Sequence, residues 1–295
     1  MSFFRTSILL STIACLTVIV HADDNESIRV AAKPNNNAKS KVPHPLDPAI
    51  EIAYQGLDRM KEIEDYTAQL IRRERTNGKL SPFEYSTVKI RNARPAEKIP
   101  FSIYMGFTKP RSINGREAIW IEGKNSDKIV AHEAGMILGK ITVFLNPNGP
   151  IAMRGNRYPM YEAGFQVLVN RLIEKAERER QYQECEVNIV EDKMVNKRPC
   201  KMIEVMHPQE REYFDFHIAR IYIDNEMQLP IRYEAYDWAE DGGEPVLLEQ
   251  YLYTKIKLNV GLTDEDFNPR SEKYNFCFAT PPKTDPDPER VAEKE

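Results

Sequence analysis

The feature that most constrains the fold of this chain is a long series of short runs in which apolar and polar residues alternate. Phe101, Ile103, Met105 and Phe107, for example, fall on one face of such a run, as they would in a half-buried strand. Turn residues separate the runs, which favours sequential hairpins over parallel crossovers. About eleven strands are expected, at residues 66–75, 82–91, 101–107, 116–123, 128–134, 141–146, 185–193, 199–206, 212–223, 230–238 and 246–258.

Two stretches follow the helical period instead. The pair Asp47-Pro48 favours a helix start because it joins a capping residue to a proline in the first turn. A second helix with a heavily charged end is predicted at 159–182, opened by Pro159. The order of one helix, six strands, a second helix and five strands predicts an α+β fold, with a large antiparallel sheet and helices on one face.

The stretch 219–238 shows how the sequence encodes one of these hairpins. Ile221 lies on the apolar side of the first strand, and Asp224-Asn225 begins the turn. Pro230 stands at the first residue of the second strand, where its missing N–H costs little. A hairpin with one dry and one wet face is therefore expected.

The first 22 residues have the pattern of an export signal. Arg5 precedes an apolar run that is too short to span a bilayer comfortably, and a cut is expected after Ala22. Lipidation at Cys15 and retention of the segment as an anchor are the alternatives. The signal predicts a periplasmic or secreted protein with no transmembrane segment after cleavage.

Polar, non-periodic sequence predicts a disordered leader at 23–43 and a disordered tail at 281–295. A single domain is expected between them, at 44–280. The formal net charge is -4, so the sequence gives no electrostatic support for a nucleic-acid partner.

Three cysteines remain after the signal, and an odd number permits at most one internal bridge. Cys185 and Cys200 are the candidate pair because they flank a predicted hairpin. If that hairpin turns at Asn196-Lys197, however, Cys200 does not face Cys185. The alternative is that both of these thiols and Cys277 are free.

Two sets of segments resemble known families. Residues 72–80, 100–107, 115–125 and 149–164 are similar to a secreted bacterial family catalogued as domain of unknown function 1571. Near the end of the chain stand Leu229-Pro230, Asn259, Asp264 or Asp266, Phe267 and Pro269. This closing section resembles the LolA/LolB-like periplasmic lipoprotein carriers, and the resemblance implies an unclosed half-barrel of about eleven strands with helices covering the concave face.

No motif in the sequence specifies a reaction. The chain lacks a nucleophile elbow, a phosphate-binding P-loop and a C-x-x-C pair. His207, Glu210, Glu212, Asp215 and His217 are metal-ligand types that lie close together, but a polar hairpin loop is the favoured interpretation. The sequence therefore predicts no metal, no cofactor and no enzymatic activity.

Apolar strand faces provide the functional hypothesis. The inward face of an unclosed barrel must be filled by helices or by an apolar ligand, and an acyl chain gains about 0.8 kcal/mol per buried CH₂. Ordinary core packing is the alternative at each position. The candidate ligand-binding residues are Phe101, Ile103, Met105, Phe107, Trp120, Phe144 and Tyr233.

Arg72, Arg73 and Arg75 are candidates to contact an anionic headgroup or envelope polymer, and a solvated, internally paired face is the alternative. The predicted function is binding of a hydrophobic or amphipathic envelope component, such as a lipid or a lipoprotein acyl chain, in the concave face. A second hypothesis is an envelope sensor or protein-interaction module, supported by the charged segment 174–184 and the leader. A hydrolase is third and disfavoured.

Overall fold

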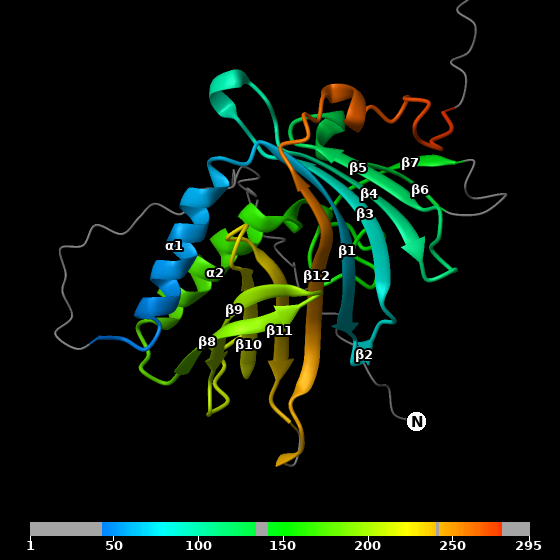
Figure 1. Ribbon diagram of the computed structural model, residues 1–295. Helices are drawn as coiled ribbons and strands as arrows, with labels where there is room; N and C mark the ends of the chain where they lie inside the picture. Colours follow the sequence, from blue (N-terminus) through cyan, green and yellow to red (C-terminus); the bar gives the residue numbers. More distant parts are fainter. Residues whose placement is uncertain (1–42, 134–140, 240–241, 279–295) are drawn as a thin grey trace, which may run out of the picture. The chain divides into compact units, whose positions relative to one another are not determined.

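The computed structural model describes residues 43–133, 141–239 and 242–278 (Figure 1). In this part of the chain, twelve strands form one antiparallel sheet in the order β7-β6-β5-β4-β3-β1-β12-β11-β10-β9-β8, with the short β2 paired to β1. Two α-helices, α1 (Asp47–Met60) and α2 (Phe165–Glu179), accompany the sheet. The strands are β1 (Asp65–Thr76), β2 (Lys79–Leu80), β3 (Glu84–Arg91), β4 (Ser102–Lys109), β5 (Glu117–Ile121), β6 (Ile129–His132), β7 (Thr142–Leu145), β8 (Glu186–Val195), β9 (Arg198–Met206), β10 (Ile218–Asp224), β11 (Pro230–Asp237) and β12 (Val246–Leu258).

The sheet consists of two meanders that join where the first strand meets the last. β1 pairs with β3 on one side and with β12 on the other. The β1–β12 register runs from Tyr66↔Leu258 to Glu74↔Glu249. β7 and β8 lie at the two edges, and no pairing between them closes the sheet within the described residues. The predicted α+β class and large, unclosed antiparallel sheet are confirmed.

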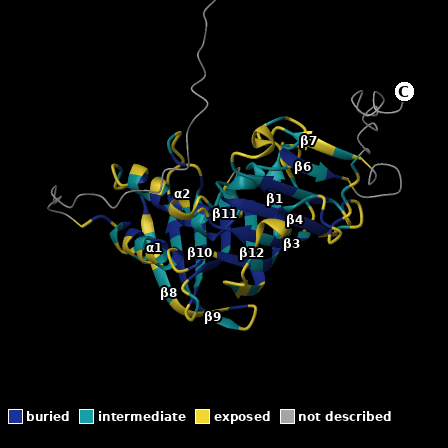
Figure 2. Ribbon diagram, turned by 90° about the horizontal axis from the view of Figure 1, so that it is seen from above, coloured by how far each residue is buried: buried dark blue, intermediate teal, exposed yellow. Residues whose placement is uncertain are grey.

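Helices α1 and α2 pack against each other and lie beside the half of the sheet that contains β8 to β11 (Figure 1). Ile50 of α1 belongs to a buried apolar cluster with Ile203 of β9 and Ile221 of β10, and Leu172 of α2 packs against the same cluster. In Figure 2 the outer sides of both helices carry exposed residues, whereas the central strands are mostly buried. The helices therefore cover one half of the sheet and leave the β4–β7 half to other segments.

The second helix begins at Phe165, six residues later than the sequence pattern predicts. Residues 160–162 form only a single 3-10 turn, Ala163 is extended, and Gly164 has a φ of 122° that favours glycine. The hydroxyl oxygen of Tyr66 accepts the backbone N–H of Phe165 at 3.0 Å, and the two rings stack with centroids 4.7 Å apart. A contact with β1 thus fixes where α2 starts.

The hairpin of β10 and β11 has the predicted turn and dry face, but its predicted wet face is partly buried, because Glu234 is 3 % exposed. Ile221 and Tyr233 are paired across the two strands and both are buried. The Asp224 carboxylate accepts the backbone N–H groups of Glu226 and Met227, which closes the turn. The predicted first strand is shorter than expected, because regular pairing begins only at residue 218 rather than 212.

The candidate disulfide is not formed: Cys185 and Cys200 are both free and buried. Glu186, the residue after Cys185, pairs with Met206, six positions along β9 from Cys200. At about 3.3 Å per residue, that offset is about 20 Å, far beyond the reach of a disulfide. Cys200 instead lies opposite Lys193, the register expected from a turn at residues 196–197.

The predicted signal peptide (1–22), the tail (281–295) and all but the last residue of the predicted leader (23–43) lie outside the described residues. Among the residues that are described, no helix has the length and apolar character needed to cross a membrane.

Candidate functional site

A groove of about 300 Å³ lies between the two helices and the strands beside them. It is at the lower end of the size range of small-molecule sites, 300–1,000 Å³. Its walls come from three layers of the fold: α1, α2 and the apolar face of β9 to β11. We call it the apolar groove and define it by Ile52, Ala53, Leu172, Ala176, Ile203 and Ile221.

Small residues of the helices account for the open space of the apolar groove. Ala49, Ala53 and Gly56 line it from α1, and Ala176 lines it from α2. A helix facing a sheet through alanines and glycine cannot fill the interlayer space as leucines would, and protein interiors otherwise pack to crystal-like density. The groove is therefore a consequence of side-chain volume on the helix faces that look toward the sheet.

Two buried carboxylates stand in the wall of the apolar groove. Asp224 is the first, and its carboxylate accepts hydrogen bonds from Arg198 and from two backbone N–H groups. Burial would raise the pKa of Asp224, but these contacts outweigh burial and lower it. Glu179 is the other, with an oxygen 3.4 Å from Nε2 of the fully buried His207. These groups give a groove lined mainly by aliphatic side chains two buried polar contacts, as ligand sites commonly have.

A second cavity, of about 350 Å³, lies on the next face of α2 and is lined mainly by charged side chains. Lys175 and Phe216 line both cavities, so the second cavity adjoins the apolar groove. We call it the polar cavity and define it by Arg157, Tyr158, Arg171, Glu174, Lys175, Arg178, Asp215 and Glu249.

The floor of the polar cavity is a carboxylate in the sheet. Glu249 is 3 % exposed and accepts hydrogen bonds from Arg157 Nε at 2.9 Å and from the Tyr158 hydroxyl at 3.2 Å. Burial raises the pKa of Glu249 and outweighs the opposing effect of Arg157. Burial, followed by the nearby Glu249 carboxylate, raises the pKa of Tyr158 as well. This side of the cavity is a fixed, internally satisfied polar surface.

The same network extends away from the cavity into β1. Glu74, which pairs with Glu249 across β1 and β12, accepts the backbone N–H of Arg157 at 2.6 Å and the Tyr251 hydroxyl at 2.9 Å. Arg72 binds Glu74 and Glu84, whose charges raise its pKa against the effect of burial. The network therefore ties the segment around residue 157 to the centre of the sheet.

The three arginines proposed as headgroup contacts are engaged inside the protein. Arg72 donates to Asn156 at 2.6 Å in addition to its ion pairs. Arg73 donates to Gln250 at 2.8 Å, and Arg75 donates to the backbone oxygen of Leu247 at 2.8 Å. None of the three lines the apolar groove or the polar cavity.

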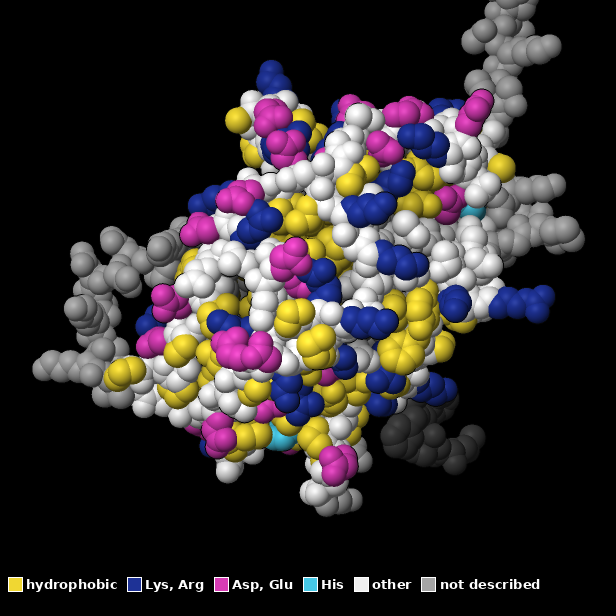
Figure 3. Space-filling view, viewed as in Figure 1, with side chains coloured by type: hydrophobic (Ala, Val, Ile, Leu, Met, Phe, Trp, Pro, Cys, Tyr) yellow, Lys and Arg dark blue, Asp and Glu magenta, His cyan; other side chains and the backbone are white. Residues whose placement is uncertain are grey.

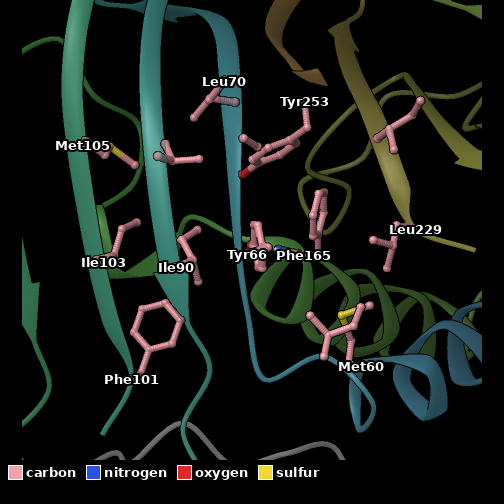
Figure 4. Close-up of a cluster of buried hydrophobic side chains, with 14 of the residues drawn as sticks. Met60, Tyr66, Leu70, Ile90, Phe101, Ile103, Met105, Phe165, Leu229 and Tyr253 are labelled. Atoms are coloured by element: carbon pink, nitrogen blue, oxygen red, sulfur yellow. Dashed lines mark hydrogen bonds between the residues drawn. The ribbon is translucent and has the colours of Figure 1, made fainter. Parts of the chain in front are cut away.

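Most of the apolar candidates lie in a separate core cluster on the other half of the sheet. Figure 4 shows Phe101, Ile103 and Met105 directed toward Tyr66 and Phe165, with no more than 4 % of any of the three candidates exposed. These side chains are packed against other parts of the chain rather than against either cavity. Phe107 and Trp120 belong to the same cluster.

The other two candidates differ from that group. Phe144, on the edge strand β7, is 49 % exposed. Tyr233 is buried and lines the polar cavity, so it alone of the seven lines either of the two cavities described above.

The cavity-lining residues of the helices were not among the site residues predicted from the sequence. The cations of α2 that line the polar cavity, Arg171, Lys175 and Arg178, recur at i, i+4 and i+7 and so form one stripe, and Glu174 lines the cavity beside them. Leu172 and Ala176, one position further along, line the apolar groove. This pair of adjacent stripes is visible in the sequence, but only the structure shows that both face open space.

The histidines and acids near residue 210 do not form a metal site. Nδ1 of His207 donates to the backbone oxygen of Phe216 at 3.0 Å, and Asp215 binds Lys175 and Arg178. In the described part of the chain, no group of three or more His, Cys, Asp or Glu residues is arranged to hold a metal ion.

On the face shown in Figure 3, basic and acidic side chains are interspersed with apolar ones.

Residues 63–276 match the family described as protein of unknown function (DUF1571). The chain belongs to this family. The matched residues include helix α2 and all the strands that line the two cavities. No curated protein matches the chain in sequence.

Solved structures with similarity to this family member are distant. The lipoprotein LppX from Mycobacterium tuberculosis is 13% identical, with a TM-score of 0.40, and the match covers 74% of this chain and 98% of LppX. A DUF1329 family protein from Desulfovibrio piger is 13% identical, with a TM-score of 0.39 and coverage of 76% and 98%. A putative outer membrane lipoprotein-sorting protein domain from Vibrio parahaemolyticus is 14% identical, with a TM-score of 0.36 and coverage of 74% and 95%.

Proposed function

We propose that this protein binds a hydrophobic or amphipathic component of the cell envelope, such as a lipid or a lipoprotein acyl chain, in the apolar groove. The observation that carries the proposal is the groove itself: about 300 Å³ of space between two helices and a sheet, lined mainly by aliphatic side chains. Apolar surface left unfilled inside a fold gains free energy when an apolar ligand covers it.

The magnitude of that gain is sufficient for weak binding of an acyl chain. Ten methylenes buried in the apolar groove contribute about 8 kcal/mol at about 0.8 kcal/mol each. Association costs of at least about 4 kcal/mol reduce this figure, so an acyl chain alone binds weakly and a second contact would be needed for tight binding. We also propose that the protein is exported, because the predicted signal peptide would deliver it to the compartment that holds such ligands.

The first test is titration of a fluorescent fatty acid into detergent-free protein, at concentrations below its micelle threshold. We expect weak, saturable binding with an affinity that rises with chain length, by up to about fourfold per added CH₂ (about 0.8 kcal/mol). Lipids that co-purify with the protein from its native compartment should be recovered and identified by mass spectrometry.

A plugged variant assigns the binding to the apolar groove. Ala53 lines the groove from α1, so Ala53→Trp should fill it and weaken binding about tenfold or more, equivalent to losing about two buried methylenes. Glu51→Trp places the same side chain at an exposed position of α1 outside the groove and is the matched control. Equal binding by both variants, or affinity independent of chain length, would remove the apolar groove as the site.

The sensor or interaction module remains the second candidate, and its support from the charged segment 174–184 is reduced by the structure. Lys175 and Arg178 bind Asp215, and Arg180 binds Asp47, so these charges are engaged within the protein. A partner that is lost on charge reversal of this segment, while fatty-acid binding persists, would favour the second candidate.

A further inference from the structure

The two cavities are separated by one helix that presents a different chemistry to each. Leu172 and Ala176 of α2 line the apolar groove, whereas Arg171 and Arg178 line the polar cavity. Lys175 lies between these stripes and lines both. A cation therefore stands at the place where the apolar surface gives way to the polar one.

The polar cavity is lined by one more cation than carboxylate, because four basic side chains stand against Glu174, Asp215 and Glu249. Lys175 Nζ and Arg178 Nη2 both bind the same oxygen, Oδ2 of Asp215, at 2.5 and 2.8 Å. These two contacts lower the pKa of Asp215 although burial opposes the shift. Arg171 takes its partner, Glu162, from outside the residues that line the cavity.

The other carboxylate at depth is already satisfied. Glu249 accepts hydrogen bonds from Arg157 and Tyr158 and is 3 % exposed, so it presents little unpaired negative charge to an incoming ligand. The accessible charges of the cavity are thus Asp215, the exposed Glu174 and the cations of α2, where side-chain exposures run from 23% for Lys175 to 48% for Arg178. An anion with several oxygens could share or replace Asp215 as the partner of these cations.

We infer that the polar cavity is an anionic-headgroup subsite, which receives a phosphate-type group attached to the apolar chain held in the adjoining groove. The inference rests on the proposed function, because it assigns the second half of the same amphipathic ligand. Lys175 contacts the junction of chain and headgroup, and Arg171 and Arg178 contact the headgroup oxygens. The headgroup supplies the second contact that an acyl chain alone lacks.

The test compares three probes by titration calorimetry: decyl phosphate, decanol and inorganic phosphate. Decyl phosphate should bind about tenfold or more tightly than decanol, because charge-assisted hydrogen bonds are worth about 1.5–3 kcal/mol each. The double variant Arg171→Gln/Arg178→Gln should remove this preference and leave decanol binding unchanged, since neither residue lines the apolar groove. Arg180→Gln is the matched control on the same helix, because Arg180 lines neither cavity.

A variant that gains affinity is also needed, because a loss of binding can result from misfolding of the variant protein. Asp215→Asn removes the carboxylate that competes for Lys175 and Arg178, so it should tighten decyl phosphate severalfold without affecting decanol. Equal affinity for decyl phosphate and decanol would overturn the headgroup assignment while leaving the groove proposal standing. Inorganic phosphate binding as tightly as decyl phosphate would also overturn it, by showing a free-phosphate site. Failure of both decyl probes to bind would instead refute the groove proposal on which the inference rests.

Discussion

Replacing Gly164 with alanine tests how the fold sets the position of α2, the helix that lines both cavities. Gly164 has a φ of 122°, a conformation that L residues rarely adopt. A Cβ added there would lie 2.9 Å from the hydroxyl oxygen of Tyr66 and 3.2 Å from Cδ1 of Ile90. Both neighbours are almost fully buried, so they have little room to move aside.

The cost follows from two terms. Forcing an L residue into a sparsely populated region costs about 1–3 kcal/mol. Displacing the Tyr66 hydroxyl, which accepts the N–H of Phe165, removes a hydrogen bond worth about 1 kcal/mol. We therefore expect Gly164→Ala to destabilise the protein by about 2–4 kcal/mol. For a domain of this size, that corresponds to a melting temperature lowered by about 4–16 °C.

Gly56→Ala is the matched control with the opposite sign. Gly56 lies inside α1, and its added Cβ would meet the methyl groups of Val169 at 3.9 and 4.0 Å, which are ordinary contacts. Because alanine is the better helix former, this variant should be more stable by about 0.5–1 kcal/mol. Urea denaturation monitored by circular dichroism measures both values on the same scale.

The double variant Gly164→Ala/Tyr66→Phe separates the two terms. Removing the hydroxyl relieves the closest contact, so the double variant should cost less than the sum of the single variants. Strict additivity would refute the contact argument. A Gly164→Ala protein as stable as the parent would refute the role of Gly164 altogether.

Two further predictions concern the faces of the sheet and the response to acid. Ile221→Asp and Tyr233→Asp should each destabilise the protein by several kcal/mol, because both side chains are buried, and melts that barely move would show that the strand faces are inverted. The pKa of Asp266 is lowered to about 2, because the Thr263 N–H, Lys89 and Lys273 together outweigh burial. Its folded-state pKa is below the ordinary value of 3.8, so its contribution to stability is complete above pH 4 and is lost as the pH falls toward 2. Asp266→Asn should flatten the stability profile in that window, and an unchanged acid transition would contradict this.

The candidate site was only partly accessible to sequence reasoning. Alternation correctly places Phe101, Ile103 and Met105 on one buried face, but it cannot say whether helices, loops or a ligand cover that face. In the structure they are packed with Tyr66 and Phe165 in a closed core. Among the strand residues proposed as ligand contacts, only Tyr233 lines one of the two cavities.

What the sequence determined by itself was local. The period of two assigned the strands, and a turn at Asp224 with Pro230 opening the next strand defined the late hairpin, because side-chain alternation and turn chemistry depend on near neighbours. The tertiary structure decided where α2 begins, through a hydrogen bond between Tyr66 and Phe165, 99 residues apart. It also decided which surfaces remain open, because a cavity depends on the summed volumes of side chains that three distant segments bring together.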